Sequence, residues 1–191
     1  ALPCFCVPTP TGYQQTILYL CGRVKPCPNA SNRFIVRNVE QWYIGAVADL
    51  FPSQPYHQRH SDAAKRDYWC IRSAHLQKPS LDDVSDWRGF CRAFVELQGS
   101  LDLWRHKNRR GEYLYSPRLR LYGTESDLAA VSAHFPAGQK KMQCITTQTG
   151  STCLLAYQSP KEVAAILDYL DGAPRNDALW QKWSAILNAP H

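Results

Sequence analysis

Apolar residues recur at helical spacing in two parts of the chain, and in both they stop at a glycine. In the middle of the sequence the apolar positions lie three or four residues apart and are Phe90, Ala93, Phe94 and Leu97. This spacing predicts a helix over residues 86–98 with one apolar stripe. Gly99 is expected to end it by adopting a left-handed conformation. Residues 13–21 repeat the spacing and end at Gly22, which predicts a second helix of the same kind.

Alternation of apolar and polar residues predicts four strands in each half of the chain. The predicted strands are residues 23–25, 33–37, 56–60 and 67–73, then 100–107, 113–122, 140–148 and 151–158. Further helices are predicted over residues 39–51, 124–135, 160–170 and 176–187. Ser159 is the predicted cap of the third of these helices, with Pro160 at its first position, and Ser80 is predicted to cap a short helix.

The two halves therefore share one order of elements: helix, strand, strand, helix, strand, strand, helix. This repetition predicts an α+β fold of two pseudo-symmetric repeats, with antiparallel sheets that have helices on one face. The expected organisation is an N-terminal arm (residues 1–12), a first repeat (13–85) and a second repeat with a C-terminal helix (86–191).

The period of two also assigns side chains to the sheet faces. If Phe34, Val36, Leu119 and Leu121 point to the helices, then Arg33, Arg37, Arg118 and Arg120 point to the helix-free face. Trp104 and His106 are expected on that face, because Leu101 and Leu103 point the other way. His57 and His60, three residues apart in one strand, are expected on opposite faces.

The net charge of +6 is small, but basic residues cluster between residues 105 and 120. A sheet face of arginine, lysine and aromatic side chains has a shape that fits a nucleic-acid groove, and flanking lysines would hold phosphates. An ordinary solvated sheet face is the alternative. The predicted nucleic-acid-binding residues are Arg23, Lys25, Arg33, Arg37, Arg59, Trp104, Arg105, His106, Arg109, Arg110, Arg118, Arg120, Tyr122, Lys140 and Lys141.

The order of elements, with the segments SPRLRLYGTESDLAAV and PKEVAAILDYL, resembles the LAGLIDADG homing endonuclease family in its single-chain, two-repeat form. The second half fits the pattern over residues 86–170, and the first half fits more loosely over residues 13–83. The resemblance implies that the two sheets form a concave saddle over DNA. It also implies that each motif helix delivers a carboxylate, from the residue before its closing glycine, to divalent metal ions that cut the DNA.

The chain departs from that pattern at both carboxylate positions, which hold Cys21 and Gln98. A thiol and a neutral amide are poor ligands for Mg²⁺. Glu96 lies two residues earlier in the helix and would face elsewhere, while Asp102 alone does not make a site. We therefore expect the scaffold without metal-dependent cleavage, no metal site and no cofactor; Mg²⁺ would be needed only if cleavage remained.

Three functions stay open at this stage. The first is a non-cleaving nucleic-acid-binding protein, either a DNA-binding regulator or a maturase-like RNA-binding protein. The second is an active Mg²⁺-dependent endonuclease with displaced metal ligands. The third is a protein-interaction module. The expected partner is double-stranded DNA or structured RNA, with a protein partner as a further option, and the expected state is a monomer with an internal pseudo-dimer.

Five of the eight cysteines lie in apolar or alternating segments and are expected to be free core thiols: Cys21, Cys70, Cys91, Cys144 and Cys153. Cys4, Cys6 and Cys27 lie in loop-like segments, and their disulfide state stays open. No apolar run approaches the length of a membrane span, and no signal peptide is recognisable. These features favour an intracellular protein, although the even number of cysteines and a glycosylation sequon at Asn29 leave secretion open.

Overall fold

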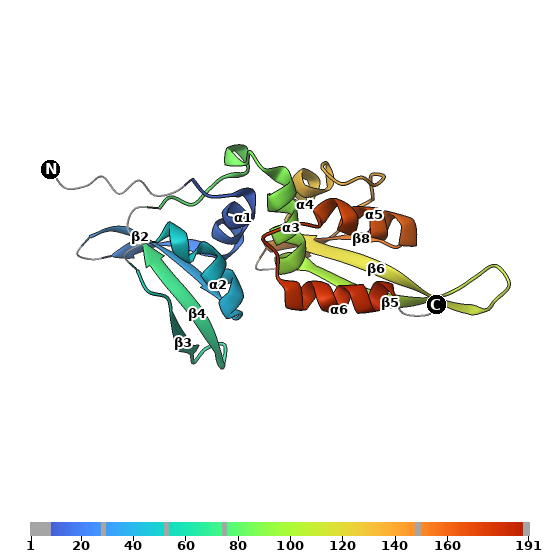
Figure 1. Ribbon diagram of the computed structural model, residues 1–191, viewed down its shortest axis with the longest axis horizontal. Helices are drawn as coiled ribbons and strands as arrows, with labels where there is room; N and C mark the ends of the chain where they lie inside the picture. Colours follow the sequence, from blue (N-terminus) through green and yellow to red (C-terminus); the bar gives the residue numbers. More distant parts are fainter. Residues whose placement is uncertain (1–8, 28–29, 52–53, 74–75, 148–149, 189–191) are drawn as a thin grey trace. The chain divides into compact units, whose positions relative to one another are not determined.

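The computed structural model describes residues 9–27, 30–51, 54–73, 76–147 and 150–188. The chain divides into two compact units, Ala1–Asp86 and Trp87–His191. Each unit contains a four-stranded antiparallel sheet with helices on one side (Figure 1). The predicted α+β class with two antiparallel sheets is thus confirmed. None of the described helices is long and apolar enough to cross a membrane.

Unit 1 begins with α1 (Gly12–Cys21), which leads directly into the first strand of its sheet. The strands are β1 (Gly22–Cys27), β2 (Ala30–Asn38), β3 (His57–Ser61) and β4 (Arg66–Ser73), in the spatial order β1-β2-β4-β3. Between the two strand pairs lie α2 (Gln41–Val47) and a 3₁₀ turn (Ala48–Leu50). A second 3₁₀ turn (Leu81–Asp83) follows β4, and Ser80 caps it as predicted by exchanging hydrogen bonds with Asp83.

Unit 2 repeats this plan and then extends it by two helices. It begins with α3 (Trp87–Gln98) and contains the strands β5 (Gly99–Lys107), β6 (Tyr113–Gly123), β7 (Gln143–Thr147) and β8 (Gly150–Tyr157). The spatial order β5-β6-β8-β7 is the same as in unit 1. The helices α4 (Glu125–Ser132), α5 (Pro160–Leu170) and α6 (Asp177–Leu187) complete the unit.

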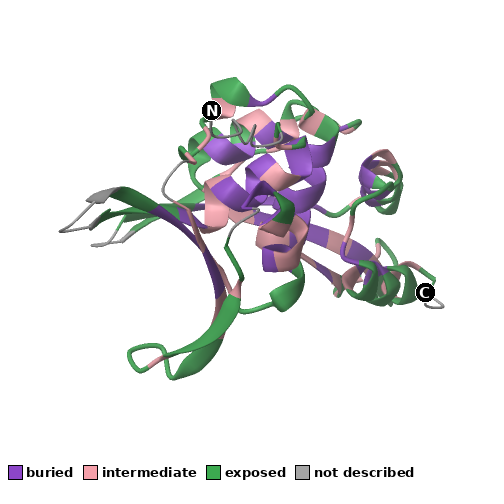
Figure 2. Ribbon diagram, turned by 60° about the vertical axis from the view of Figure 1, so that its left-hand side comes forward, coloured by how far each residue is buried: buried purple, intermediate pink, exposed green. Residues whose placement is uncertain are grey.

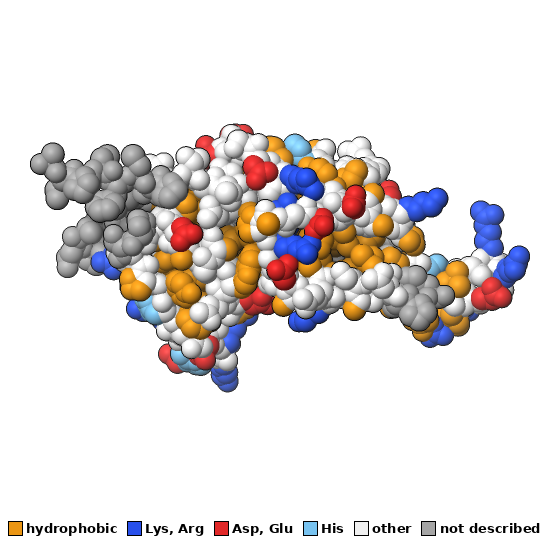
Figure 3. Space-filling model, in the orientation of Figure 1, with side chains coloured by type: hydrophobic (Ala, Val, Ile, Leu, Met, Phe, Trp, Pro, Cys, Tyr) orange, Lys and Arg blue, Asp and Glu red, His pale blue; other side chains and the backbone are white. Residues whose placement is uncertain are grey.

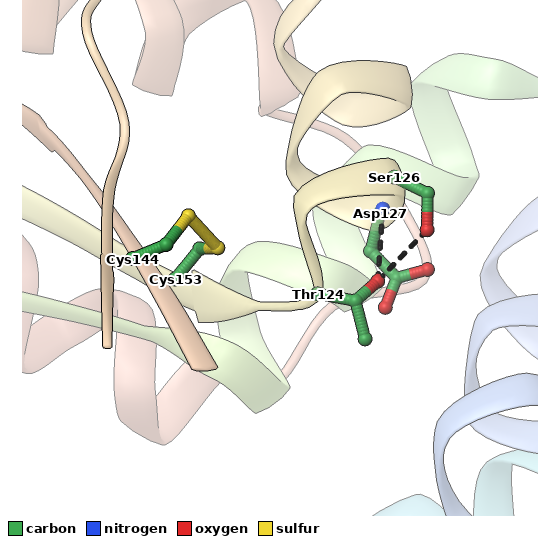
Figure 4. Close-up of a disulfide and its surroundings, with 5 residues drawn as sticks. All are labelled: Thr124, Ser126, Asp127, Cys144 and Cys153. Carbon is green, nitrogen blue, oxygen red and sulfur yellow. Dashed lines mark hydrogen bonds between the residues drawn. A yellow bond between two sulfur atoms is a disulfide. The ribbon is translucent and has the colours of Figure 1, made fainter. Parts of the chain in front are cut away.

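Side-chain caps fix where α1 and α4 begin. Thr11 and Gln14 form a reciprocal capping box at α1, with hydrogen bonds of 3.2 and 3.0 Å. At α4 the hydroxyl of Thr124 accepts a hydrogen bond from the Asp127 backbone N–H at 3.2 Å (Figure 4). Ser159 occupies the N-cap position of α5, as predicted, but its side chain makes no capping hydrogen bond.

Some predicted boundaries differ from the structure. The helix predicted over residues 39–51 ends as α-helix at Val47 and continues as a 3₁₀ turn. Strand β1 runs through Pro26 instead of being broken there. Proline is tolerated at this position because β1 is an edge strand, and a register shift between Lys25 and Cys27 accommodates it.

The glycines after α1 and α3 are required by space and not by a left-handed backbone, so the expectation for Gly99 was wrong. Gly22 is extended, with φ −84° and ψ 141°, and Gly99 is not among the residues with positive φ. A Cβ atom on Gly22 would collide with the carbonyl oxygen of Leu18, and one on Gly99 with that of Val95. Only glycine therefore allows the helix to pass without a loop into the strand.

Each unit has its own apolar core between its sheet and its helices. In Figure 2 the buried residues concentrate in the helices and the central strands, whereas the outer end of the β3–β4 hairpin is exposed. In unit 1 the fully buried side chains include Tyr13, Ile17, Val36, Ile44 and Ile71, and in unit 2 they include Phe90, Phe94, Leu119, Leu121 and Ile166. The apolar stripe predicted for residues 86–98 faces the core of unit 2.

Cys144 and Cys153 form a disulfide, so the expectation of free thiols was wrong for this pair (Figure 4). The two residues are nine apart in sequence and are direct cross-strand partners of β7 and β8. Alternation indicates strands but not their register, and so it could not reveal this pairing. Cys21, Cys70 and Cys91 form no disulfide in the part of the chain that the structure describes, as expected. Cys4 and Cys6 lie outside the described residues, as does the side chain of Cys27.

Candidate nucleic-acid interface

The sheet of unit 1 carries a row of basic side chains on the side that faces away from its helices. Phe34, Val36 and Ile71 point toward the helices and are almost completely buried. The cross-strand register places their strand neighbours on the opposite side. We call that side the basic face, and its cationic residues are Arg23, Lys25, Arg33, Arg37, Arg59, Arg66 and Arg72.

No acidic residue of the described strands of unit 1 lies on the basic face. Asp67 is on the other side of the sheet, where its carboxylate lies 2.7 Å from Nδ1 of His60. His57 is on the basic face, so the two histidines lie on opposite faces, as predicted. Seven cations without an opposing strand carboxylate produce a one-signed potential, which attracts a polyanion.

Contacts among the side chains of the basic face leave hydrogen-bond donors available. The guanidinium of Arg37 lies 5.0 Å from the centre of the Tyr68 ring, and Arg59 Nε donates to Nε2 of His57 at 2.8 Å. The Nε atoms of Arg37 and Arg72 are buried without a hydrogen-bond partner among the described residues. Such donors can be satisfied by a ligand that brings its own acceptor oxygens.

The corresponding side of the unit 2 sheet, which we call the mixed face, has a different character. It carries Trp104 and His106, whose rings stack with centroids 5.0 Å apart. Asp102 accepts hydrogen bonds from Arg118 at 3.0 Å and from Arg120 at 2.7 Å. Two arginines and one aspartate leave these strands a formal charge of only +1 on this face. The basic excess was expected in both halves, but the structure concentrates it in unit 1.

The Asp102 carboxylate is held in its ionised form by its partners. The hydrogen bond from Arg118 lowers the pKa of Asp102, partial burial opposes this, and the charges of Arg118 and Arg120 lower the pKa further. At neutral pH the aspartate is therefore a permanent counterion. It neutralises part of the charge that Arg118 and Arg120 would otherwise offer to a phosphate.

Arg105 and Lys140, both predicted to bind nucleic acid, lie away from the helix-free faces. The register pairs Arg105 with Tyr115 on the helix side of the sheet, and its guanidinium lies 3.6 Å from the centre of the Tyr113 ring. Lys140 precedes β7 and forms an ion pair of 2.7 Å with Glu162 of α5. Arg105 lies there because strand alternation puts it on the same side as Leu101 and Leu103, and Lys140 because of its ion pair with Glu162; a count of charges along the sequence includes neither.

The remaining predicted residues are distributed as follows. Arg23, Lys25, Arg33, Arg37 and Arg59 lie on the basic face, whereas Trp104, His106, Arg118, Arg120 and Tyr122 lie on the mixed face. Lys141 is exposed before β7, and Arg109 and Arg110 are exposed in the turn between β5 and β6. Figure 3 shows basic side chains at the free end of this hairpin.

Three residues of β4 on the basic face were not predicted: Arg66, Tyr68 and Arg72. They lie in β4 with Cys70, on the side opposite to Ile71. Their signal was present in the sequence, because residues two apart on either side of Cys70 must share its face. The apolar residues of YWCIR indicated a buried strand, and the alternation of Arg66, Tyr68 and Arg72 was not used to predict a binding face.

Comparisons with known proteins support the fold alone. No family model matches the sequence, and no curated protein matches it. Among solved structures, the homing endonuclease I-LtrWI bound to target DNA matches with a TM-score of 0.59 at 8% identity, covering 92% of this chain and 90% of that one. The meganuclease I-CpaMI bound to uncleaved DNA matches with a TM-score of 0.61 at 6% identity, covering 94% and 92%.

The chain has the two-repeat LAGLIDADG fold. Full-length DUF199/WhiA from Thermatoga maritima is also similar, with a TM-score of 0.50 at 15% identity, and the match covers 95% of this chain and 62% of that one. The resemblance inferred from the sequence is thereby confirmed at the level of the fold. The identities are too low to carry over an activity from any of these proteins.

Both motif helices of this LAGLIDADG fold end on residues without a carboxylate. Cys21 ends α1, and its sulfur accepts a hydrogen bond from Asn38 Nδ2 at 3.4 Å. Burial raises the pKa of the Cys21 thiol, which therefore stays neutral at physiological pH. Gln98 ends α3. Neither group replaces a carboxylate at Mg²⁺, because a thiol is a soft ligand and the Gln98 amide carries no charge.

The two acidic residues that could replace the missing carboxylates in unit 2 already have partners. Glu96 is buried, and its Oε1 accepts hydrogen bonds from Trp180 Nε1 at 2.7 Å and from the Asn176 backbone N–H at 3.1 Å. Asp102 is held by its two arginines. Within the part of the chain that the structure describes, no three His, Cys, Asp or Glu side chains gather as metal ligands would. At the two described helix ends, Cys21 and Gln98 do not supply the carboxylates that a divalent metal ion such as Mg²⁺ prefers.

Proposed function

We propose that the chain is a non-cleaving nucleic-acid-binding protein, with double-stranded DNA as its partner, built on the LAGLIDADG fold. The observation that carries this proposal is the basic face of unit 1, with seven cations and no strand carboxylate. A curved sheet with arginines on one side can follow the phosphates along a groove. The DNA-bound states of I-LtrWI and I-CpaMI, which share the fold, support DNA as the partner.

The absence of cleavage is supported by the contacts that the candidate metal ligands already make. Two-metal cleavage of a phosphodiester needs anionic oxygens that face the metal ions. Glu96 faces α6, Asp102 faces two arginines, and the helix ends supply Cys21 and Gln98. Each of these features argues against hydrolysis of a bound nucleic acid. A protein that binds DNA without cutting it would act as a DNA-binding regulator, and one that binds RNA would act as a maturase-like protein.

The proposal is tested by measuring binding to duplex DNA and to a structured RNA of equal length by fluorescence anisotropy across a salt series. If the basic face contacts phosphates, log K should fall linearly with log salt. Seven phosphate contacts would give a slope no steeper than roughly −6 for duplex DNA. Tighter binding to the duplex supports DNA as the partner, and tighter binding to the RNA replaces it by RNA. No binding at about 50 mM salt, or no dependence on salt, would refute the proposal.

Cleavage is tested separately with supercoiled plasmid and Mg²⁺. We expect the plasmid to stay intact under conditions where gel shift shows that it is bound. Nicking that disappears in both Asp102→Asn and Glu96→Gln would replace this proposal by the active endonuclease.

A second candidate function, protein interaction, is favoured by one observation. Tyr113, Leu114 and Tyr115 are 52%, 42% and 47% exposed at the outer end of the β5–β6 hairpin. Single exposed apolar residues are normal, whereas exposed apolar residues that lie together mark interaction sites, and Tyr113 and Tyr115 share one side of β6. A stable complex with another protein that persists after nuclease treatment, and that Tyr113→Ser weakens, would favour this candidate.

A further inference from the structure

One hollow of unit 1 opens beside the basic face and has an unusual lining. Its volume is about 390 Å³, and it is lined by Arg33, Gln54, Pro55, His57, Arg72 and Ser73. These residues come from β2, the segment before β3, the start of β3, and β4. The sheet order β1-β2-β4-β3 makes these strands neighbours, so segments distant in sequence form one concavity.

The chemistry of the lining favours an anion. Two guanidinium groups and one imidazole contribute to it, and no carboxylate does. A guanidinium presents a planar fork of N–H donors that matches the spacing of two phosphate oxygens. The Nε atom of Arg72 is buried and has no hydrogen-bond partner among the described residues. A buried donor of this kind is costly unless an acceptor reaches it.

The hollow differs from the rest of the basic face in shape as well as in donors. Arg23 and Arg66 share the face but do not line the hollow, so they can hold a phosphate only from an open surface. Arg33 and Arg72 lie on different strands and can contact one phosphate from two sides. The volume exceeds the need of a phosphate alone and leaves space for an attached sugar, since pockets for small ligands begin at about 300 Å³.

We propose that this hollow binds one phosphate group of a nucleic acid through Arg33, Arg72 and His57, and so anchors the chain at a defined phosphate. The proposal rests on the proposed function for the source of that phosphate. The group can be an internal phosphodiester or a terminal phosphomonoester, because both offer the oxygens that the two arginines recognise.

The test uses the full chain and small probes, namely pyrophosphate, the dinucleotide TpT and its 5′-phosphorylated form pTpT. Binding is followed by isothermal titration and by backbone amide NMR. We expect pyrophosphate to bind and to shift the amides of residues 33, 57 and 72. Tighter binding of pTpT than of TpT identifies a terminal phosphate, and equal binding identifies a phosphodiester.

Matched variants separate the hollow from the general charge of the face. Arg33→Gln and Arg72→Gln remove one charge each from the hollow, while Arg23→Gln and Arg66→Gln remove one charge each from outside it. We expect about a tenfold or larger loss of pyrophosphate affinity in the first pair and less than about threefold in the second, because an opposing bidentate contact is worth more than a distant charge. Arg72→Lys keeps the charge but not the fork and should fall between the two pairs.

Equal losses in all four variants, or no pyrophosphate binding by the unmodified chain, would overturn the proposed hollow. Arg33 is exposed, so Arg33→Gln gives a result even if a substitution at Arg72 disturbs folding. The two proposals can fail separately. Duplex binding without a special effect of Arg33 and Arg72 removes the hollow alone, whereas pyrophosphate binding without nucleic-acid binding removes the proposed function alone.

Discussion

Asp102 shows how one side chain can neutralise the charge that its neighbours would offer to a ligand. Its carboxylate accepts three hydrogen bonds from Arg118 and Arg120, at distances of 2.7 to 3.0 Å. Alternation placed both arginines on the helix-free face, which is correct, but it did not indicate that an aspartate directly opposite Arg118 and diagonal to Arg120 would neutralise part of their charge. A sequence pattern gives the side of a sheet on which a residue lies, and pairing across that side depends on the register.

The pKa of Asp102 gives a prediction about pH. A carboxyl whose pKa is lowered by folding stabilises the protein above its unfolded pKa of about 3.9, and this contribution is lost as the pH falls through the folded pKa. Asp102→Asn should therefore reduce the free energy of unfolding at pH 7, and the difference from the unmodified protein should shrink below about pH 4. Urea denaturation at several pH values measures this difference.

The control for this measurement is Asp168→Asn, at an exposed position of α5. Its difference from the unmodified protein should be small at every pH. If Asp102→Asn gives the same difference at pH 7 and at about pH 3, the hydrogen bonds to the arginines do not carry the effect.

The Cys144–Cys153 disulfide gives a second prediction at this scale. Peptide mapping of the unreduced protein should recover the two cysteines in one linked species. A link across nine residues restricts the unfolded chain, so Cys144→Ser should lower the free energy of unfolding by roughly 1–3 kcal/mol. A reductant should bring the unmodified protein to the level of the variant and leave the variant unchanged. Full alkylation of both cysteines without reduction would contradict the disulfide.

At the scale of elements, α3 holds the C-terminal part of unit 2 through two buried charged side chains. Arg92 donates through Nε to the carbonyl oxygen of Leu170 and through Nη1 to that of Pro174, at the end of α5 and beyond it. Glu96 accepts from the N-cap and the first turn of α6. The polar residues of the motif helix thus have a structural role, which explains why Glu96 is buried.

Glu96→Ala should loosen α6. The substitution leaves Trp180 Nε1 and the Asn176 N–H without their acceptor, which costs about 1–3 kcal/mol for each buried donor that stays unpaired. We expect a lower midpoint of urea denaturation and a red shift of tryptophan fluorescence, because Trp180 becomes exposed. Glu125→Ala, at an exposed position of α4, should change neither reading substantially. Unchanged fluorescence in Glu96→Ala would show that α6 is held by apolar packing alone.

The elements themselves were largely predictable, because long apolar stripes and alternating strands have distinct periods. Their ends were less so. Residues 140–142 were expected in a strand but lie before β7, where Lys140 is bound to Glu162. Such a boundary depends on a contact with α5 more than 20 residues away, which local periodicity does not contain. The same limit applies to the hollow beside the basic face, since its lining comes from segments that only the sheet order brings together.

At the scale of the whole molecule, one topology occurs twice with two different surfaces. The basic face of unit 1 has seven cations and no strand carboxylate, whereas the mixed face of unit 2 has two cations, one aspartate and a stacked aromatic pair. Phosphate contacts give affinity and salt dependence, whereas contacts through aromatic and neutral polar groups add little to the salt dependence. The two units are therefore expected to contribute unequally to nucleic-acid binding.

This inequality predicts different salt slopes for matched variants of the two units. Arg59→Gln on the basic face should make the slope of log K against log salt shallower by about 1, because one phosphate contact is lost. Arg118→Gln on the mixed face should change the slope by less than about half of that, because Arg118 already has Asp102 as its counterion. Asp102→Asn should have the opposite sign and strengthen binding at low salt, since it removes the negative charge that Arg118 and Arg120 share. Equal slopes in Arg59→Gln and Arg118→Gln would mean that Asp102 releases its arginines when nucleic acid binds, and that both units hold phosphates alike.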